Sequence, residues 1–138
     1  MRIMAVDYGD VRTGLAVSDP GGLLAGDAWT VNGWDPQTVA DEIAREAKMR
    51  SVGRIVLGLP RNMDGSEGAR AEKSRAFGTL LQEKTGLEVV MWDERLTTVD
   101  AHRILSGAGK HGKKRREKID AVAATLILEG YLGSGQAR

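Results

Sequence analysis

A short apolar run that ends in a carboxylate, residues 3–7, constrains the fold of this chain more than any other feature. Ile3, Met4, Ala5 and Val6 are all apolar. The run therefore predicts a β-strand that is covered on both faces, as in the centre of a sheet with helices on each side. A charged residue directly after such a strand is costly unless a partner compensates its charge. Asp7 therefore predicts a partner group from elsewhere in the chain.

The rest of the pattern predicts an α/β domain. Further strands are expected at residues 15–18, 28–31, 54–60 and 87–92, with helices at about 35–50, 67–84, 98–107 and 119–132. The first three strands follow one another through short turns, and the later ones alternate with helices. We therefore expect a five-stranded mixed sheet in which the first three strands are antiparallel. The length fits one domain, residues 1–138, with 133–138 as a loose tail.

Composition excludes several kinds of site. The chain has no cysteine, which excludes disulfides, thiolate metal sites and cysteine nucleophiles. Its two histidines are too few for a His-based metal site, so Asp and Glu oxygens remain, and they suit Mg²⁺ or Mn²⁺. No signal-peptide pattern and no apolar stretch of about 20 residues is present. We expect a cytoplasmic protein that does not contact membranes.

Four acids lie where an α/β sheet forms its sites. Asp7 ends the first strand, Asp93 and Glu94 follow the fifth, and Asp120 begins the last, buried helix. Each acid alone has an ordinary explanation: Asp7 as a turn residue, Asp93 or Glu94 as a solvated strand end, and Asp120 as a helix N-cap. If three of them converged they would repel one another, and a bound divalent cation would remove that repulsion. Spacing alone does not establish that they converge.

Basic residues are concentrated in one segment, residues 110–118, where six of nine positions are Lys or Arg. The whole chain has a net charge of only +1, so the remainder is net acidic. Such a run is typical of a solvated loop, but it directly precedes Asp120, and a basic segment beside an acidic metal site suits a polyanion. The candidate nucleic-acid contacts are Arg12, Arg70, Arg95, Lys110, Lys113, Lys114, Arg115 and Arg116. The six aromatic residues are too few to make base stacking an obvious mode of recognition.

A glycine-rich segment, residues 58–70, connects the fourth strand to the next helix. It lacks the pattern of a P-loop. It suits either a plain connection or a backbone cradle for a phosphate at a helix N-terminus. Asp64 or Ser66 is expected to cap that helix. The helix that begins near residue 35 is expected to have Asp35 as its N-cap and Pro36 at its first position.

Four blocks of sequence together resemble one family. They are "VDYGDVRTGLAVSD", "GLPRNMDGSEGARA", "DERLTT" and "KIDAVAATLILEGYL". They resemble the YqgF family of RNase H-like proteins, described both as Holliday-junction resolvases and as pre-16S ribosomal RNA nucleases. The resemblance covers residues 2–132. It implies an RNase H-like sheet flanked by helices and a catalytic, metal-binding triad of Asp7, Glu94 and Asp120, with Glu94 rather than Asp93 in the "DER" position.

The resemblance implies a nuclease that uses one or two Mg²⁺ or Mn²⁺ ions to cut structured nucleic acid. The favoured substrate is the precursor of 16S ribosomal RNA, with ribosomal particles as further partners. A four-way DNA junction is the alternative within the nuclease class. A non-catalytic nucleic-acid-binding factor in ribosome assembly or transcription is the alternative outside it. Both a monomer and a homodimer stay open, since a junction resolvase needs two active sites.

Overall fold

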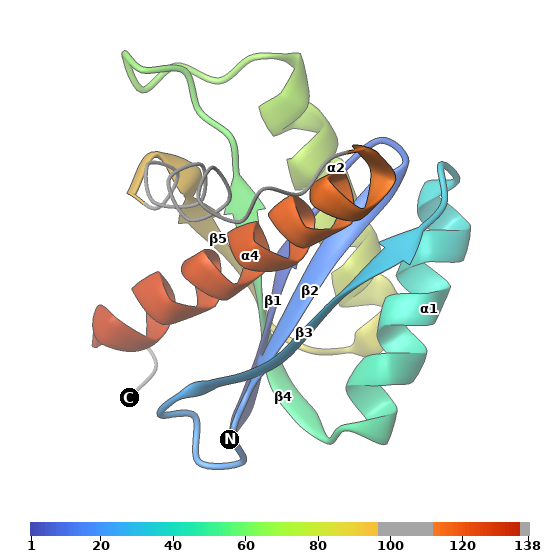
Figure 1. Ribbon diagram of the computed structural model, residues 1–138, viewed down its shortest axis with the longest axis vertical. Coiled ribbons are helices and arrows are strands. Elements are labelled where there is room, and N and C mark those ends of the chain that lie inside the picture. The colour runs from blue at the N-terminus through green and yellow to red at the C-terminus, as the bar shows by residue number, and fades with distance from the viewer. Residues whose placement is uncertain (97–111, 136–138) are drawn as a thin grey trace.

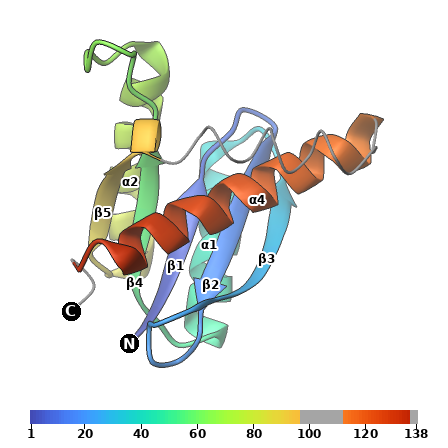
Figure 2. The ribbon, with the colours of Figure 1, turned by 60° about the vertical axis from the view of Figure 1, so that its left-hand side comes forward.

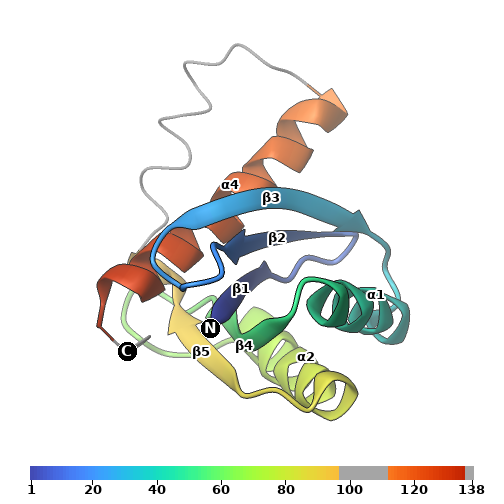
Figure 3. The same cartoon turned by 90° about the horizontal axis from the view of Figure 1, so that it is seen from below.

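A five-stranded sheet lies between two layers of helices in the computed structural model (Figure 1), which describes residues 1–96 and 112–135, with side chains for 1–96 and 121–135. The strands are β1 (Arg2–Asp7), β2 (Arg12–Ser18), β3 (Ala25–Asn32), β4 (Val52–Leu59) and β5 (Val89–Asp93). Figure 3 shows α1 (Pro36–Met49) and α2 (Ala69–Thr85) on one face and α4 (Gly112–Gly133) on the other. The expected α/β architecture is confirmed. The domain boundaries stay a prediction, because 97–111 and 136–138 lie outside the described residues.

The sheet order is β3-β2-β1-β4-β5. β1 pairs antiparallel with β2, which pairs antiparallel with β3, and β1 pairs parallel with β4, which pairs parallel with β5. This confirms the expected change from antiparallel to parallel pairing. Because β1, β4 and β5 run in the same direction, their carboxyl ends meet at one edge of the sheet. Asp7, which ends β1, and Asp93, which ends β5, are thereby brought to the same edge.

The core has two halves, one on each face of the sheet. Along β1, Met4 and Val6 belong to the half covered by α1 and α2, whereas Ile3 and Ala5 belong to the half covered by α4. All four are at most 1% exposed, so the prediction of a strand covered on both faces is confirmed. This alternation continues past the strand, because side chains of successive residues point to opposite faces. Tyr8 packs against the α1–α2 half.

Two helix starts were predicted, and one is correct. The Asp35 side chain accepts a hydrogen bond from the Gln37 amide (3.2 Å), and Pro36 occupies the first turn of α1, as expected. The prediction that Asp64 or Ser66 caps α2 is wrong, since its N-cap is Gly68 without a side-chain bond. The carboxylate of Asp64 instead accepts the Ser66 amide (2.9 Å) within the preceding loop.

The last helix begins earlier than expected. α4 starts at Gly112, so residues 113–118 form its first turns and not a loop. Lys, Arg and Glu have high helix propensity, which lets the helix continue beyond its buried part. Figure 2 shows these turns projecting past β3. The helix expected near residues 98–107 lies outside the described residues, and none of the described helices is long and apolar enough to cross a membrane.

Candidate active site

Two acids from distant strands meet at the edge of the sheet. A side-chain hydrogen bond joins Asp7, at the end of β1, to Glu94, directly after β5. β4 lies between these two strands. Neighbouring strands are about 4.8 Å apart, so the Glu94 side chain has to cross the end of β4 to reach Asp7. The structure therefore brings a second acid to Asp7, which adds negative charge and does not by itself compensate the charge of Asp7.

Gly58 of β4 makes this crossing possible. A Cβ built on Gly58 would collide with the Glu94 carboxylate and would lie 2.8 Å from Cδ1 of Ile127 in α4. Any side chain at this position would displace Glu94, Ile127 or both. This role of Gly58 was not predicted, although an isolated glycine inside an apolar strand indicates a close approach of other atoms.

Burial raises the pKa of Asp7 well above its usual value. The hydrogen bond and the negative charge of Glu94 raise this pKa further, and the positive charge of Arg70 lowers it in part. The charged form of Asp7 is therefore disfavoured in this site. Two carboxyls that repel each other at one edge of the sheet form a donor set suited to a hard divalent cation, because a cation removes their repulsion.

The third predicted acid, Asp120, is on α4. Its side chain lies outside the described ones, so its approach to Asp7 and Glu94 stays a prediction. Among the side chains that the structure does describe, no three His, Asp or Glu residues form a metal-binding group.

Asp93 has a different role: its carboxylate accepts hydrogen bonds from the Arg95 amide (3.0 Å) and guanidinium (2.6 Å from Nη2). This contact lowers the pKa of Asp93.

Two of the predicted arginines lie near the ends of the strands that carry the acids. Arg70 donates to Asp10 Oδ1 (2.7 Å) and to the carbonyl of Tyr8 (3.0 Å), next to β1. Arg95, next to β5, also reaches the carbonyl of Met63 (3.5 Å). The third, Arg12, begins β2 and is partly buried.

The other basic candidates are on or before α4. Lys113, Lys114, Arg115 and Arg116 lie in its first turns, and their side chains are not among the described ones. Lys110 lies outside the described residues. Their contact with nucleic acid stays a prediction.

The glycine-rich loop is closed by its own hydrogen bonds. The amide of Asn62 donates to the carbonyl of Ser66 (2.9 Å), and the amide of Gly65 to the carbonyl of Asn62 (2.9 Å). The Ser66 amide is bound by Asp64. These amides are therefore not directed at an outside anion, which favours the plain connection over the phosphate cradle.

Comparison with known families gives these residues a context. The family described as RuvX, Holliday junction resolvase, matches residues 1–134. The chain belongs to the RuvX family. Membership places it among the nucleases, enzymes that hydrolyse phosphodiester bonds, and confirms the resemblance seen in the sequence.

Relatives of this RuvX-family chain span almost its whole length. It is 43% identical to a protein of Pelotomaculum thermopropionicum over 97% of this chain and 88% of that one. It is 46% identical to a protein of Halothermothrix orenii over 96% and 94% of the two chains. A protein of Myxococcus xanthus is 47% identical over 96% and 87%. All three carry the name "Putative pre-16S rRNA nuclease".

Solved structures confirm the fold of the RuvX-family chain. Thermus thermophilus RuvC in complex with a Holliday junction superposes with a TM-score of 0.59 over 98% of this chain and 96% of that one, at 12% identity. The fowlpox virus resolvase in complex with Holliday junction DNA gives a TM-score of 0.59 over 97% and 98%, at 13% identity. The expected RNase H-like sheet is therefore correct.

We predict that Gly58→Ala lowers the rate of phosphodiester cleavage at least tenfold. The added methyl group displaces the Glu94 carboxylate while the strand itself keeps its pairing. Because Ile127 is also crowded, a loss of about 1–3 kcal/mol in unfolding free energy is expected as well. Gly78→Ala is the matched control. Its Cβ would lie 3.2 Å from Leu57 Cδ2, on the face of the sheet away from the acids, and should leave the rate unchanged. Equal rates for Gly58→Ala and the native chain would contradict this role.

We also predict that Asp7→Asn raises the melting temperature by several degrees at neutral pH without divalent ions. The folded-state pKa of Asp7 is raised, so the native chain loses stability as pH rises from the unfolded-state pKa, near 4, through the folded-state value. The side-chain amide of Asn at position 7 does not ionise, so the variant does not lose this stability. The gain should therefore disappear below about pH 4.

Thermal unfolding across pH tests this prediction. Asp27→Asn, which removes a carboxylate that is 82% exposed, should show no comparable gain. Added Mg²⁺ or Mn²⁺ should stabilise the native chain and not Asp7→Asn. A lower melting temperature for Asp7→Asn at neutral pH would mean that Asp7 is ionised and compensated by groups other than a cation.

Proposed function

We propose that this chain is a divalent-metal-dependent endonuclease that acts in the cytoplasm on the precursor of 16S ribosomal RNA. The observation that carries the proposal is the hydrogen bond between Asp7, whose carboxyl is desolvated by burial, and Glu94 at the carboxyl edge of the sheet. Such a pair costs stability and needs Gly58 to form, which suits a functional requirement and not a structural one. The names of the relatives, which span nearly the whole chain, favour ribosomal RNA as the substrate.

Asp7, Glu94 and Asp120 would hold the Mg²⁺ or Mn²⁺. When bound, the ion activates a water molecule for attack and offsets the negative charge of the phosphate. Helical spacing supports Asp120 as the third ligand: position 120 precedes the buried residues Ala124 and Ile127 by four and seven positions, so the three positions share one face of α4.

The chain's own residues prepare the site in three ways. Asp7 and Glu94 would both act as ligands, because a bound cation would favour the charged form of Asp7. Gly58 keeps the path of the Glu94 side chain open. Arg70 already contributes positive charge next to Asp7. The basic turns of α4 would then bind the nucleic-acid backbone.

A DNA-junction resolvase is the second candidate. It is favoured by the resemblance of the fold to two resolvases whose structures contain Holliday junctions. That likeness concerns the fold, and the substrate differs between proteins of one fold. A non-catalytic factor fits less well, since it would keep the cost of two buried acids without using them.

We expect the purified protein, with Mg²⁺ or Mn²⁺, to cut a precursor ribosomal RNA fragment that contains single-stranded or looped segments. RNA offers a 2′-hydroxyl and unpaired bases, which a four-way DNA junction does not. A side-by-side cleavage assay at matched salt makes the test, with Asp7→Asn as the control for contaminating nucleases. Paired, Asp7-dependent nicks in the junction, with the RNA left intact, would favour the resolvase.

We expect the first turns of α4 to bind phosphates. Changing Lys113, Lys114, Arg115 and Arg116 together to Gln should weaken binding to many RNA sequences alike. It should also flatten the plot of log affinity against log salt by roughly 0.7–0.9 for each phosphate that the variant no longer neutralises. Changing Arg45 and Lys48 of α1 to Gln is the control and should leave the slope unchanged. An unchanged slope in the fourfold variant would show that these side chains touch no phosphate.

A further inference from the structure

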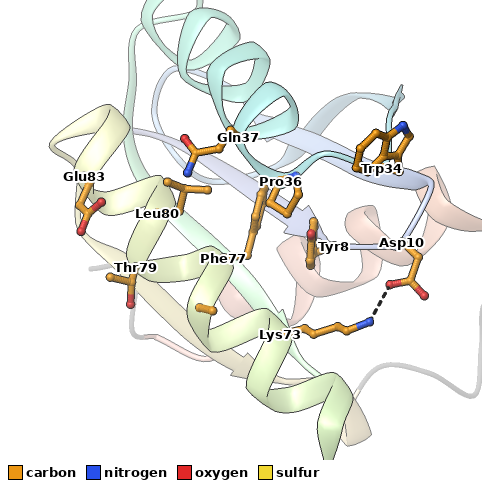
Figure 4. Close-up of a pocket in the computed structure, with 11 residues that line it drawn as sticks. Tyr8, Asp10, Trp34, Pro36, Gln37, Lys73, Phe77, Thr79, Leu80 and Glu83 are labelled. Atoms are coloured by element: carbon orange, nitrogen blue, oxygen red, sulfur yellow. Dashed lines mark ion pairs between the residues drawn. The ribbon is translucent and has the colours of Figure 1, made fainter.

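A pocket of about 490 Å³ opens between α1 and α2, on the face of the sheet that these helices cover (Figure 4). Asp7 is followed directly by Tyr8, which lines the pocket and packs against the α1–α2 half of the core. The volume of the pocket lies in the range of about 300–1,000 Å³ that is typical of small-molecule sites. Neither the proposed chemistry nor the hydrophobic core uses this pocket.

The pocket gathers aromatic side chains that are far apart in the sequence. Tyr8, Trp34 and Phe77 line it, which is half of the six aromatic residues of the chain. The rings of Tyr8 and Phe77 are stacked, with centroids 3.9 Å apart and planes 9° from parallel. In Figure 4 both rings are seen edge-on, with Trp34 and Asp10 beyond Tyr8. The fold thus makes base stacking available, which the low aromatic content did not indicate.

Trp34 has no packing role that explains it. It directly precedes Asp35, the N-cap of α1, and an apolar residue in this place commonly packs against the fourth helical residue, here Val39. Val39 is only 1% exposed and lies in the core, whereas Trp34 is 79% exposed. The indole is therefore held at the rim of the pocket with its surface open to solvent.

Two cations lie beside the pocket, next to the acid pair. Lys73 is 3.5 Å from Asp10 Oδ1, and Arg70 binds both Asp10 and the carbonyl of Tyr8. Both cations contact the same Asp10 carboxylate, so a phosphate placed here would be near both of them. Gln37 also lines the pocket, and its side-chain amide can bond to the polar edge of a base, whereas Glu83 lies at the end of the pocket away from Trp34 (Figure 4).

We propose that this pocket binds one unpaired nucleobase of the substrate strand, next to the phosphodiester that is cut. The base stacks on the open aromatic surface of Trp34 and Tyr8, and Arg70 and Lys73 hold the phosphate between the pocket and the acid pair. This rests on the proposed function, because it takes the substrate to be a strand with unpaired bases. Binding of an unpaired base in this pocket would give the enzyme a preference for single-stranded segments at the cleavage position.

Binding without cleavage tests the proposal. A 12-nucleotide single-stranded RNA is titrated into the protein in EDTA, so no metal-dependent cleavage occurs. Trp34→Ala should weaken binding roughly 5- to 100-fold, the range expected for one stacked base. Leu24→Ala removes an apolar side chain that is 72% exposed, in the β2–β3 connection, and should bind like the native chain.

Two further measurements identify the base as the occupant. RNA should quench part of the tryptophan fluorescence of the native chain, and Trp34→Phe should lose this quenching whereas Trp29→Phe keeps it. Trp34→Ala and the native chain should bind an abasic strand of the same length equally. Equal affinity of Trp34→Ala and the native chain for ordinary RNA would overturn the proposal, and RNA cleavage by the native chain would then still stand.

Other outcomes separate the alternatives. If Trp34→Ala alters sedimentation and leaves RNA affinity unchanged, the pocket holds a second copy of the chain and the proposal is wrong. In a second outcome, RNA quenches the native fluorescence as expected and Trp34→Ala binds RNA more weakly, while the native chain cuts no RNA with Mg²⁺ or Mn²⁺. This result would support the base pocket and contradict the proposed nuclease function.

Discussion

The buried contact between Asp7 and Glu94 is the constraint on which the site depends. Two acids that approach each other away from water must share a proton or a cation. The sheet enforces the approach, because β1 and β5 end at the same edge with only β4 between them. The missing side chain at Gly58 then lets the two carboxyls meet. The cost of this arrangement is part of the folded state, and a bound cation would remove it.

β1 serves both sides of the molecule through the alternation of its side chains. Asp7 is hydrogen-bonded to Glu94, and the next residue, Tyr8, lines a pocket with Phe77 on the α1–α2 face. Between them, Arg70 binds the backbone of Tyr8 and lowers the pKa of Asp7 in part. One strand end thus carries the proposed metal ligand Asp7 directly before Tyr8 of the proposed base pocket.

Much of the fold followed from local rules in the sequence. The apolar run before Asp7 predicted a covered central strand, and Asp35 with Pro36 predicted the start of α1. The pairing of Asp7 with Glu94 followed only from the family resemblance, since it joins groups that are distant in the sequence. The start of α2 was missed because Asp64 closes a turn with Ser66.

Other features were missed because they depend on tertiary contacts. The role of Gly58 depends on a side chain that arrives from another strand. The pocket depends on Trp34 and Phe77, which come together only when α1 and α2 cover the same face. Neither the spacing of these residues nor their local sequence contains that information.

The order of elements along the chain determines when the site can form during synthesis. β1 and β2 pair as a local hairpin, but the partner of Asp7 follows β5, and α4, the last element, covers the face of the sheet that holds Ile3 and Ala5. Contacts between distant segments form late, since long loops must first be closed. A growing chain on the ribosome therefore has the hairpin of β1 and β2 well before Glu94 and α4 have been made. A nuclease site that needs Glu94 and α4 would in this way stay incomplete until most of the chain has left the machinery that makes it.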